Sequence, residues 1–161
     1  MATYQWVSGA VPKDLPIRQV YGIAFDDKGR ILLRIENGKY QLTGGKPEPY
    51  DATMEDTLKR EFMEEANITL KNIHMLGYQY VEEDSCAYAQ VRMIAQIDEI
   101  MEQRPDPDNG EIYRRLLTSP ENVKKYLNWG EVGNAQIDDA VALAKTCYLP
   151  EHLKEEFLDP K

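Results

Sequence analysis

The sequence predicts an α/β fold in which a mixed β-sheet is covered by helices. Short apolar segments separated by glycine, asparagine and aspartate turn signals are typical of strands, and they occur in both halves of the chain. One segment with helical periodicity lies between these strands, and another follows them. Strand hairpins joined by a helical crossover indicate a mixed sheet with helices packed on it.

The first predicted strands are residues 19–25 (QVYGIAF) and 30–35 (RILLRI). Because the turn signal Asp26-Asp27-Lys28-Gly29 separates them, we expect a hairpin. A third extended piece, residues 40–42, follows the turn at Asn37-Gly38 and ends in the flexible pair Gly44-Gly45. A proline-bearing loop to Tyr50 then leads into a helix.

The residues from Thr53 to about Ala66 predict that helix. Apolar residues recur at every fourth position and form a seam, which consists of Met54, Leu58 and Phe62. Thr53 and Asp56 have the spacing of an N-cap pair, and Asn67 can end the helix in a left-handed conformation.

The second half of the chain predicts three further strands and two helices. The apolar runs 73–81 and 87–97 flank the polar turn 82–85 and are typical of long antiparallel strands. A loop rich in Pro and Asp, residues 104–110, precedes a last strand at 112–118. Ser119-Pro120 is a favourable helix start. The buried stripe of a C-terminal helix follows at Ile137, Val141, Ala144 and Tyr148.

Composition limits the classes of protein that fit. With 161 residues and 42% hydrophobic residues, we expect a single domain spanning 1–161. The formal charge of −9 argues against nucleic-acid binding, and no segment has the apolar length to span a membrane. Because Cys86 and Cys147 lie far apart and no secretory signal is evident, we expect a cytoplasmic protein.

Three carboxylates crowd one edge of the helix predicted at 53–66. Glu61 and Glu65 are one turn apart, and Glu64 adjoins them. Like charges at this spacing repel unless a cation lies among them, and clustered carboxylate oxygens suit Mg²⁺ or Mn²⁺. The alternative is an ordinary solvated face that Lys59 and Arg60 partly neutralise.

The stretch from Gly44 to Ile68 resembles the Nudix box, Gly-x5-Glu-x7-Arg-Glu-u-x-Glu-Glu-x-Gly-u, where u is apolar. The positions that match in register are Gly45, Arg60, Glu61, Phe62, Glu64, Glu65 and Ile68. The sequence departs from the pattern at three points. Asp51 replaces the first Glu, one extra residue falls at Ala52, and Asn67 replaces the closing Gly.

The resemblance implies a Nudix-like α/β/α sandwich and a Mg²⁺-dependent pyrophosphohydrolase of the MutT-like type, with Mn²⁺ as a substitute. The metal ligands it implies are Glu61, Glu64, Glu65 and the backbone carbonyl of Gly45. Arg60 would orient Glu61, Asp51 would orient Arg60, and Glu61 is the first choice for the general base. A further ligand is expected from a later loop, where Glu111 is the best candidate, although a solvated turn fits equally well.

Other polar and aromatic residues carry weaker signals. His74 and His152 lack partners at ligand spacing, so we expect structural or surface roles for them. Neither cysteine has the neighbours that a nucleophile or a zinc site needs, and we assign them no role. Tyr4, Trp6 and Trp129 are candidates for the wall of a nucleotide pocket. No substrate-binding residue is predicted with more definition than this.

The expected substrate is a small nucleoside-diphosphate-linked molecule: a nucleoside triphosphate, a sugar nucleotide or a dinucleotide. A second hypothesis is a catalytically weakened Nudix-like sensor that binds a nucleotide, which the departures at Asp51, Ala52 and Asn67 favour. A Nudix-fold isomerase of isoprenoid diphosphates would need a catalytic cysteine, and none can be located. The apolar and aromatic residues between Ala2 and Val20 could form a homodimer interface.

Overall fold

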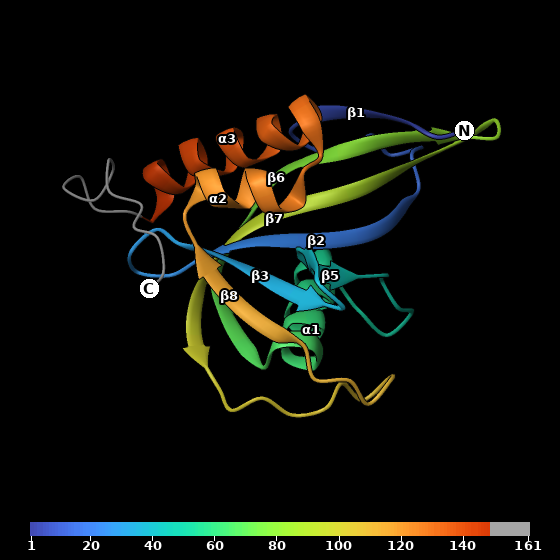
Figure 1. Cartoon of the computed structure of the whole chain (residues 1–161). Coiled ribbons are helices and arrows are strands. Elements are labelled where there is room, and N and C mark those ends of the chain that lie inside the picture. The colour runs from blue at the N-terminus through green and yellow to red at the C-terminus, as the bar shows by residue number, and fades with distance from the viewer. Residues whose placement is uncertain (149–161) are drawn as a thin grey trace.

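A computed structural model of the chain describes residues 1–148, in which a mixed sheet lies between helices (Figure 1). The strands are β1 Thr3–Ser8, β2 Ile17–Phe25, β3 Ile31–Glu36, β4 Lys39–Gln41, β5 Thr43–Gly45, β6 Ile68–Glu83, β7 Cys86–Ile100 and β8 Arg114–Thr118. The helices are α1 Met54–Ala66, α2 Pro120–Leu127 and α3 Gly130–Cys147. His152, for which a structural or surface role was predicted, lies outside the described residues.

The sheet has the strand order β1-β6-β7-β2-β3-β4, with β5 added beside β2 and β8 beside β3. Strands β2 and β7 are parallel, and the other pairs are antiparallel. The predicted mixed sheet is therefore confirmed. The long hairpin of β6 and β7 is also confirmed, and it extends beyond the predicted ends of both strands.

The predicted hairpin of the first two strands forms only at its turn. Strands β2 and β3 pair at Phe25 and Ile31 and then separate. Strand β5 takes the place beside β2, where Thr43 to Gly45 pair with Val20 to Gly22, while β3 pairs with β8. Gly44 and Gly45 are thus strand residues, and the prediction of a flexible pair was wrong because their backbone groups find a partner in β2.

Helix α1 covers one face of the sheet, and α2 and α3 cover the other (Figure 1). Successive side chains of a strand point to opposite faces. In β2, Val20 and Ala24 belong to the cluster under α1, whereas Ile23 and Phe25 belong to the cluster under α2 and α3. The two hydrophobic cores hold the three layers together.

Close packing and local caps fix helix α1. A Cβ atom at Gly22 would lie 2.7 Å from the Phe62 ring and 2.9 Å from Leu58, so the helix rests directly on the β2 backbone. The Thr53 side chain accepts a hydrogen bond from the Asp56 N–H, and Asn67 has φ 53° in the left-handed region. The predicted N-cap, apolar seam and C-terminal Asn are all confirmed.

The N-terminal strand β1 is not among the predicted strands. It forms an edge of the sheet, where all of its residues pair with β6. The Trp6 indole N–H donates to Asp139 on α3 at 2.7 Å, which fixes the strand to that helix. Among residues 1–148, no helix is long and apolar enough to cross a membrane.

Candidate metal site

Arg60 is held by a two-point ion pair with Asp51. Its Nε lies 3.1 Å from Asp51 Oδ1, and its Nη2 lies 2.9 Å from Oδ2. The Asp51 side chain is 5% exposed and that of Arg60 is 17% exposed, so water screens the pair little. Each charge favours the ionised form of the other, which lowers the pKa of Asp51 and raises that of Arg60.

The lengthened loop before α1 brings Asp51 within reach of Arg60. The Glu48 N–H donates to Asp51 Oδ2 at 2.9 Å, and the Thr57 hydroxyl donates to the same oxygen at 2.9 Å. Arg60 Nη2 also donates to the Lys46 carbonyl at 3.1 Å. The shorter Asp side chain and the extra residue at Ala52 therefore leave the support of Arg60 intact.

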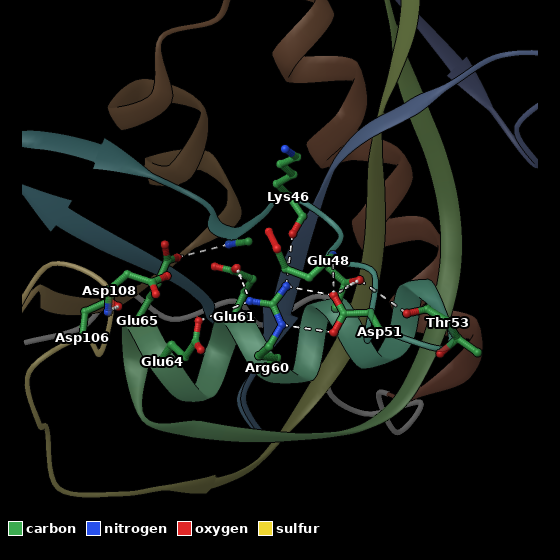
Figure 2. A network of polar contacts seen from close by, with 12 residues as sticks. Lys46, Glu48, Asp51, Thr53, Arg60, Glu61, Glu64, Glu65, Asp106 and Asp108 are labelled. Atoms are coloured by element: carbon green, nitrogen blue, oxygen red, sulfur yellow. Dashed lines mark hydrogen bonds and ion pairs between the residues drawn. The ribbon is translucent and has the colours of Figure 1, made fainter.

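Arg60 also contacts two carboxylates on the acidic face of α1. Its Nη1 lies 2.8 Å from Glu61 Oε1 and 3.3 Å from Glu64 Oε1. Figure 2 shows the three glutamates projecting from α1 beside Arg60. One guanidinium therefore connects the loop before α1 to two of the predicted ligands.

Gly45 leaves room for the Glu61 carboxylate. A Cβ atom at Gly45 would lie 2.6 Å from both Cδ and Oε2 of Glu61. Glu61 is 9% exposed and therefore buried against this glycine. Only a residue without a side chain leaves space for the carboxylate at this position.

Glu65 lies between a backbone amide and an arginine. The Gly44 N–H donates to Glu65 Oε1 at 3.3 Å, and Arg34 Nε lies 3.4 Å from the same oxygen. The Arg34 guanidinium also stacks over the Tyr113 ring, with 4.4 Å between Cζ and the ring centroid. Strands β3 and β5 thus contribute to the site together with α1.

The third glutamate, Glu64, meets two aspartates of the loop that follows β7. Ligand oxygens of Glu64, Asp106 and Asp108 all lie within 4.8 Å of one another, and Figure 2 shows the aspartates beside the C-terminal half of α1. The predicted Glu111 is exposed and does not belong to this cluster. Its backbone carbonyl accepts a hydrogen bond from the Asp106 N–H at 2.8 Å instead.

Asn67, which replaces the closing Gly of the motif, ties this loop to α1. Its side-chain oxygen accepts a hydrogen bond from the Arg104 N–H at 2.7 Å, and its Nδ2 donates to the Met63 carbonyl at 2.9 Å. Its own carbonyl accepts from the Met101 N–H at 2.9 Å. The substitution therefore keeps the helix end and adds a contact that a glycine lacks.

The pKa values of the three α1 glutamates are raised, so a proton or a cation is favoured beside them. Burial raises the pKa of Glu65 to about 7, with a further rise from Glu61 and an opposing effect of Arg34. Burial likewise raises the pKa of Glu61 and of Glu64, and the neighbouring carboxylates add to both shifts. Hard oxygen donors at this density suit Mg²⁺ or Mn²⁺, so the residues present fit a divalent cation.

A cleft with a volume of about 930 Å³ is lined by residues of the sheet together with α2 and Trp129, and none of the α1 glutamates lines it. Tyr21 lies between the cleft and the acidic face of α1, because its backbone pairs with Gly44 on one side and with Arg92 on the other. The pKa of Tyr21 is raised mainly by burial; Arg92 lowers it and Glu65 raises it further. Of the predicted pocket aromatics, Tyr4 and Trp129 line the cleft. Trp6 does not, because its indole is turned to Asp139.

Most residues of the cleft escaped prediction, Arg92 among them, and so did Arg34, Asp106 and Asp108 at the acidic face. The paired aspartates sit in the predicted Pro and Asp loop, and their spacing was the available signal. Each arginine interrupts an apolar strand, which is unusual for a charged residue and indicates a specific partner.

The fold and the acidic helix define the class of protein as an α/β/α sandwich with a Nudix-type motif. The chain belongs to the NUDIX domain family, whose model matches residues 15–136. No curated protein matches the sequence significantly.

Solved structures share the fold. A mutant of the pyrophosphohydrolase BsRppH from Bacillus subtilis is 20% identical with a TM-score of 0.71, and the match covers 92% of this chain and 94% of that one. MutT, from a study of the enzymes of Aliivibrio salmonicida and Vibrio cholerae, is 19% identical with a TM-score of 0.57, over 78% and 96%. The Ap4A hydrolase of C. elegans is 14% identical with a TM-score of 0.57, over 81% and 98%.

Proposed function

We propose that the protein is a Mg²⁺-dependent hydrolase that cleaves a phosphoanhydride bond in a nucleoside-diphosphate-linked substrate. The observation that carries the proposal is the cluster of Glu64 with Asp106 and Asp108 on the face of α1 that also carries Glu61 and Glu65. A cleft of nucleotide size begins at Tyr21, which pairs with Gly44. The family supports it, since three structural relatives are named as a pyrophosphohydrolase, MutT and an Ap4A hydrolase.

The proposed ligands for the cation are Glu61, Glu64, Glu65 and the Gly45 carbonyl, with Asp106 and Asp108 as further ligands from the loop after β7. When bound, a divalent cation neutralises charge on a diphosphate and lowers the pKa of a bound water. Glu111 was the sequence-based candidate for the loop ligand, and the cluster at Glu64 favours the two aspartates in its place.

The protein's own residues would position the reaction. Arg60 Nη1 holds Glu61 Oε1 at 2.8 Å, which leaves Oε2 free to accept the proton of the attacking water. Because burial raises the pKa of Glu61 above its ordinary value, its carboxylate is a stronger base than one in water. Asp51 acts through Arg60 as a positioning residue, since its carboxylate fixes the guanidinium at two points.

The competing sensor hypothesis drew on the departures from the motif. Asp51 nevertheless pairs with Arg60, and Asn67 keeps the left-handed helix end. These contacts remove the structural reason for expecting lost catalysis, and we therefore place the hydrolase first.

The test is hydrolysis by the purified protein of nucleoside triphosphates, sugar nucleotides and dinucleotides, with Mg²⁺ and with EDTA. We expect release of phosphate, pyrophosphate or a nucleoside monophosphate from at least one class, abolished by EDTA and restored by excess Mg²⁺ or Mn²⁺. If no compound is cleaved but one raises the melting temperature, the protein is a sensor and the proposal fails.

A further inference from the structure

A buried arginine forms part of the floor of the cleft. Arg92 belongs to β7, lines the cleft and is only 2% exposed. Its Nε donates to Gln136 Oε1 at 2.9 Å, while Nη1 reaches the carbonyls of Gln90 and Val91 only at the long distance of 3.5 Å. Within residues 1–148, no carboxylate forms an ion pair with it. No described carboxylate therefore neutralises the buried charge.

Such a charge is costly without a partner. Burial lowers the pKa of Arg92 to about 10, and Tyr21 opposes this effect. Although the chain has a net charge of −9, no carboxylate of residues 1–148 is paired with this guanidinium. A buried charged group with a shifted pKa that lines a cleft is a candidate binding residue. The free side of Arg92 therefore points to a ligand.

A chain of glutamine amides holds Arg92 in one orientation. Gln136 Nε2 donates to Gln79 Oε1 at 2.9 Å, and Gln79 Nε2 donates to Gln90 Oε1 at 2.7 Å. Gln90 Nε2 in turn donates to Gln19. Because every amide is oriented by the next, the oxygen of Gln136 must face Arg92 Nε. The guanidinium is thereby fixed. Nη1 makes only the two long contacts, and no side chain of residues 1–148 holds Nη2, so both groups can donate to a ligand.

Aromatic rings surround this guanidinium. Its Cζ lies 5.1 Å from the centroid of Tyr21 and 5.4 Å from that of Trp129. Tyr40 and Tyr126, which also line the cleft, are stacked with their centroids 4.2 Å apart. Flat rings beside a planar hydrogen-bond donor suit a flat heterocycle better than a tetrahedral phosphate.

We infer that Arg92 determines base specificity in this cleft by donating from its two Nη groups to a nucleobase that presents two adjacent acceptors. This inference rests on the proposed function, because the diphosphate of the same nucleotide would extend past Tyr21 to the acidic face of α1. Guanine and hypoxanthine present O6 and N7 on one edge and match a guanidinium at two points. Adenine presents an N6 amino group in place of O6, and two donors then face each other.

The first experiment varies the ligand and leaves the protein unchanged. Calorimetry without divalent metal would compare binding of GMP, IMP, AMP and 7-deaza-GMP, with ribose 5-phosphate as a probe for phosphate alone. We expect GMP and IMP to bind about tenfold more tightly than AMP and 7-deaza-GMP, since a two-point contact discriminates by roughly 5- to 150-fold. Equal binding of GMP and AMP, binding of ribose 5-phosphate as tight as that of GMP, or no binding at all would each overturn the inference.

The second experiment removes the guanidinium. Arg92→Met keeps the length of the side chain, and Arg18→Met is the matched control, because Arg18 is exposed, stacks on Tyr88 at 4.1 Å and lies outside the cleft. We expect Arg92→Met to abolish the preference for GMP over AMP and Arg18→Met to retain it. A preference that persists in a folded Arg92→Met variant contradicts the inference, and if that variant does not fold, the ligand series alone decides.

These tests separate the inference from the proposed hydrolase. Binding of nucleoside monophosphates needs neither metal nor cleavage, so base preference can be present in a protein that hydrolyses nothing. Conversely, metal-dependent hydrolysis without any preference between GTP and ATP would leave the proposed function standing and refute the role of Arg92.

Discussion

Asp51 holds Arg60 at two points, with 3.1 Å between Oδ1 and Nε and 2.9 Å between Oδ2 and Nη2. The pair joins the loop before α1 to the face of the helix that carries Glu61 and Glu64. A shorter acid and a lengthened loop thus produce the connection that the motif makes with a glutamate.

The contributions of Asp51 and Arg60 to the free energy of unfolding should depend strongly on each other. Removing one partner of a buried pair leaves an uncompensated charge, so Asp51→Ala is expected to lower the free energy of unfolding by about 3 kcal/mol. Arg60→Met should cost a similar amount, and the double variant should cost clearly less than the sum, as urea unfolding can measure. Additive effects of the two substitutions would show that the pair contributes little.

Metal-free protein should lose stability as the pH rises. Burial raises the pKa of Glu65 from its ordinary 4.5 to about 7, so the folded state binds more protons than the unfolded state between these values. Stability therefore falls as the pH increases through this window, by roughly 3 kcal/mol at most for this group. Glu61 and Glu64 shift in the same direction and add to the fall.

The measurement is thermal unfolding from pH 5 to pH 8 in EDTA. Glu65→Gln should flatten the profile and raise the melting temperature at pH 8, whereas Glu55→Gln, an exposed residue in the first turn of the same helix, should leave the profile unchanged. Added Mg²⁺ should restore the stability of the unsubstituted protein at pH 8. A melting temperature that rises with pH in EDTA would refute this account of the carboxylates.

Gly45→Ala should separate activity from stability. The added Cβ would lie 2.6 Å from the Glu61 carboxylate, which must then move. Because the displaced atoms are the end of a flexible side chain, we expect the free energy of unfolding to change by less than about 1 kcal/mol. Hydrolysis should nevertheless fall by roughly 100-fold, since a misplaced catalytic group is costly. Retention of full activity would mean that the position of Glu61 is not critical.

The loop after β7 should bind the cation through Asp106 and Asp108. Asp106→Asn and Asp108→Asn are each expected to weaken Mn²⁺ binding by roughly tenfold or more, as measured by electron paramagnetic resonance. Glu111→Gln is the matched control from the same loop, because Glu111 lies outside the cluster. The affinity of this variant for Mn²⁺ should be unchanged. If Glu111→Gln weakened Mn²⁺ binding and the two aspartate variants did not, Glu111 would be the ligand from this loop.

Local signals made α1 predictable. Thr53, the seam at Met54, Leu58 and Phe62, and the left-handed Asn67 all act within a turn or two of themselves, and the structure has them as expected. The fold family was also predictable, because Arg60, Glu61, Glu64 and Glu65 stand in register behind Gly45.

Features that depend on distant partners were not predictable in the same way. The pairing of β2 with β5 and β7 is a choice between strands that no turn signal encodes. No residue of strand β1 is fully buried, so the strand lacks an apolar pattern that would reveal it. The choice of Asp106 and Asp108 over Glu111 depends on how a loop folds against α1, and this follows from contacts such as that of Asn67 with Arg104.

The central claim is that the acidic face of α1 supports metal-dependent hydrolysis. Its most direct test is the rate of hydrolysis of the best substrate with Mg²⁺ by the unsubstituted protein, Glu64→Gln, Glu65→Gln and the control Glu55→Gln. We predict that kcat/KM falls by roughly 100-fold in the first two variants, which is about 2.7 kcal/mol of transition-state stabilisation, and is unchanged in Glu55→Gln. Equal rates in all four proteins, or a substrate that binds without being cleaved by any of them, would contradict the claim.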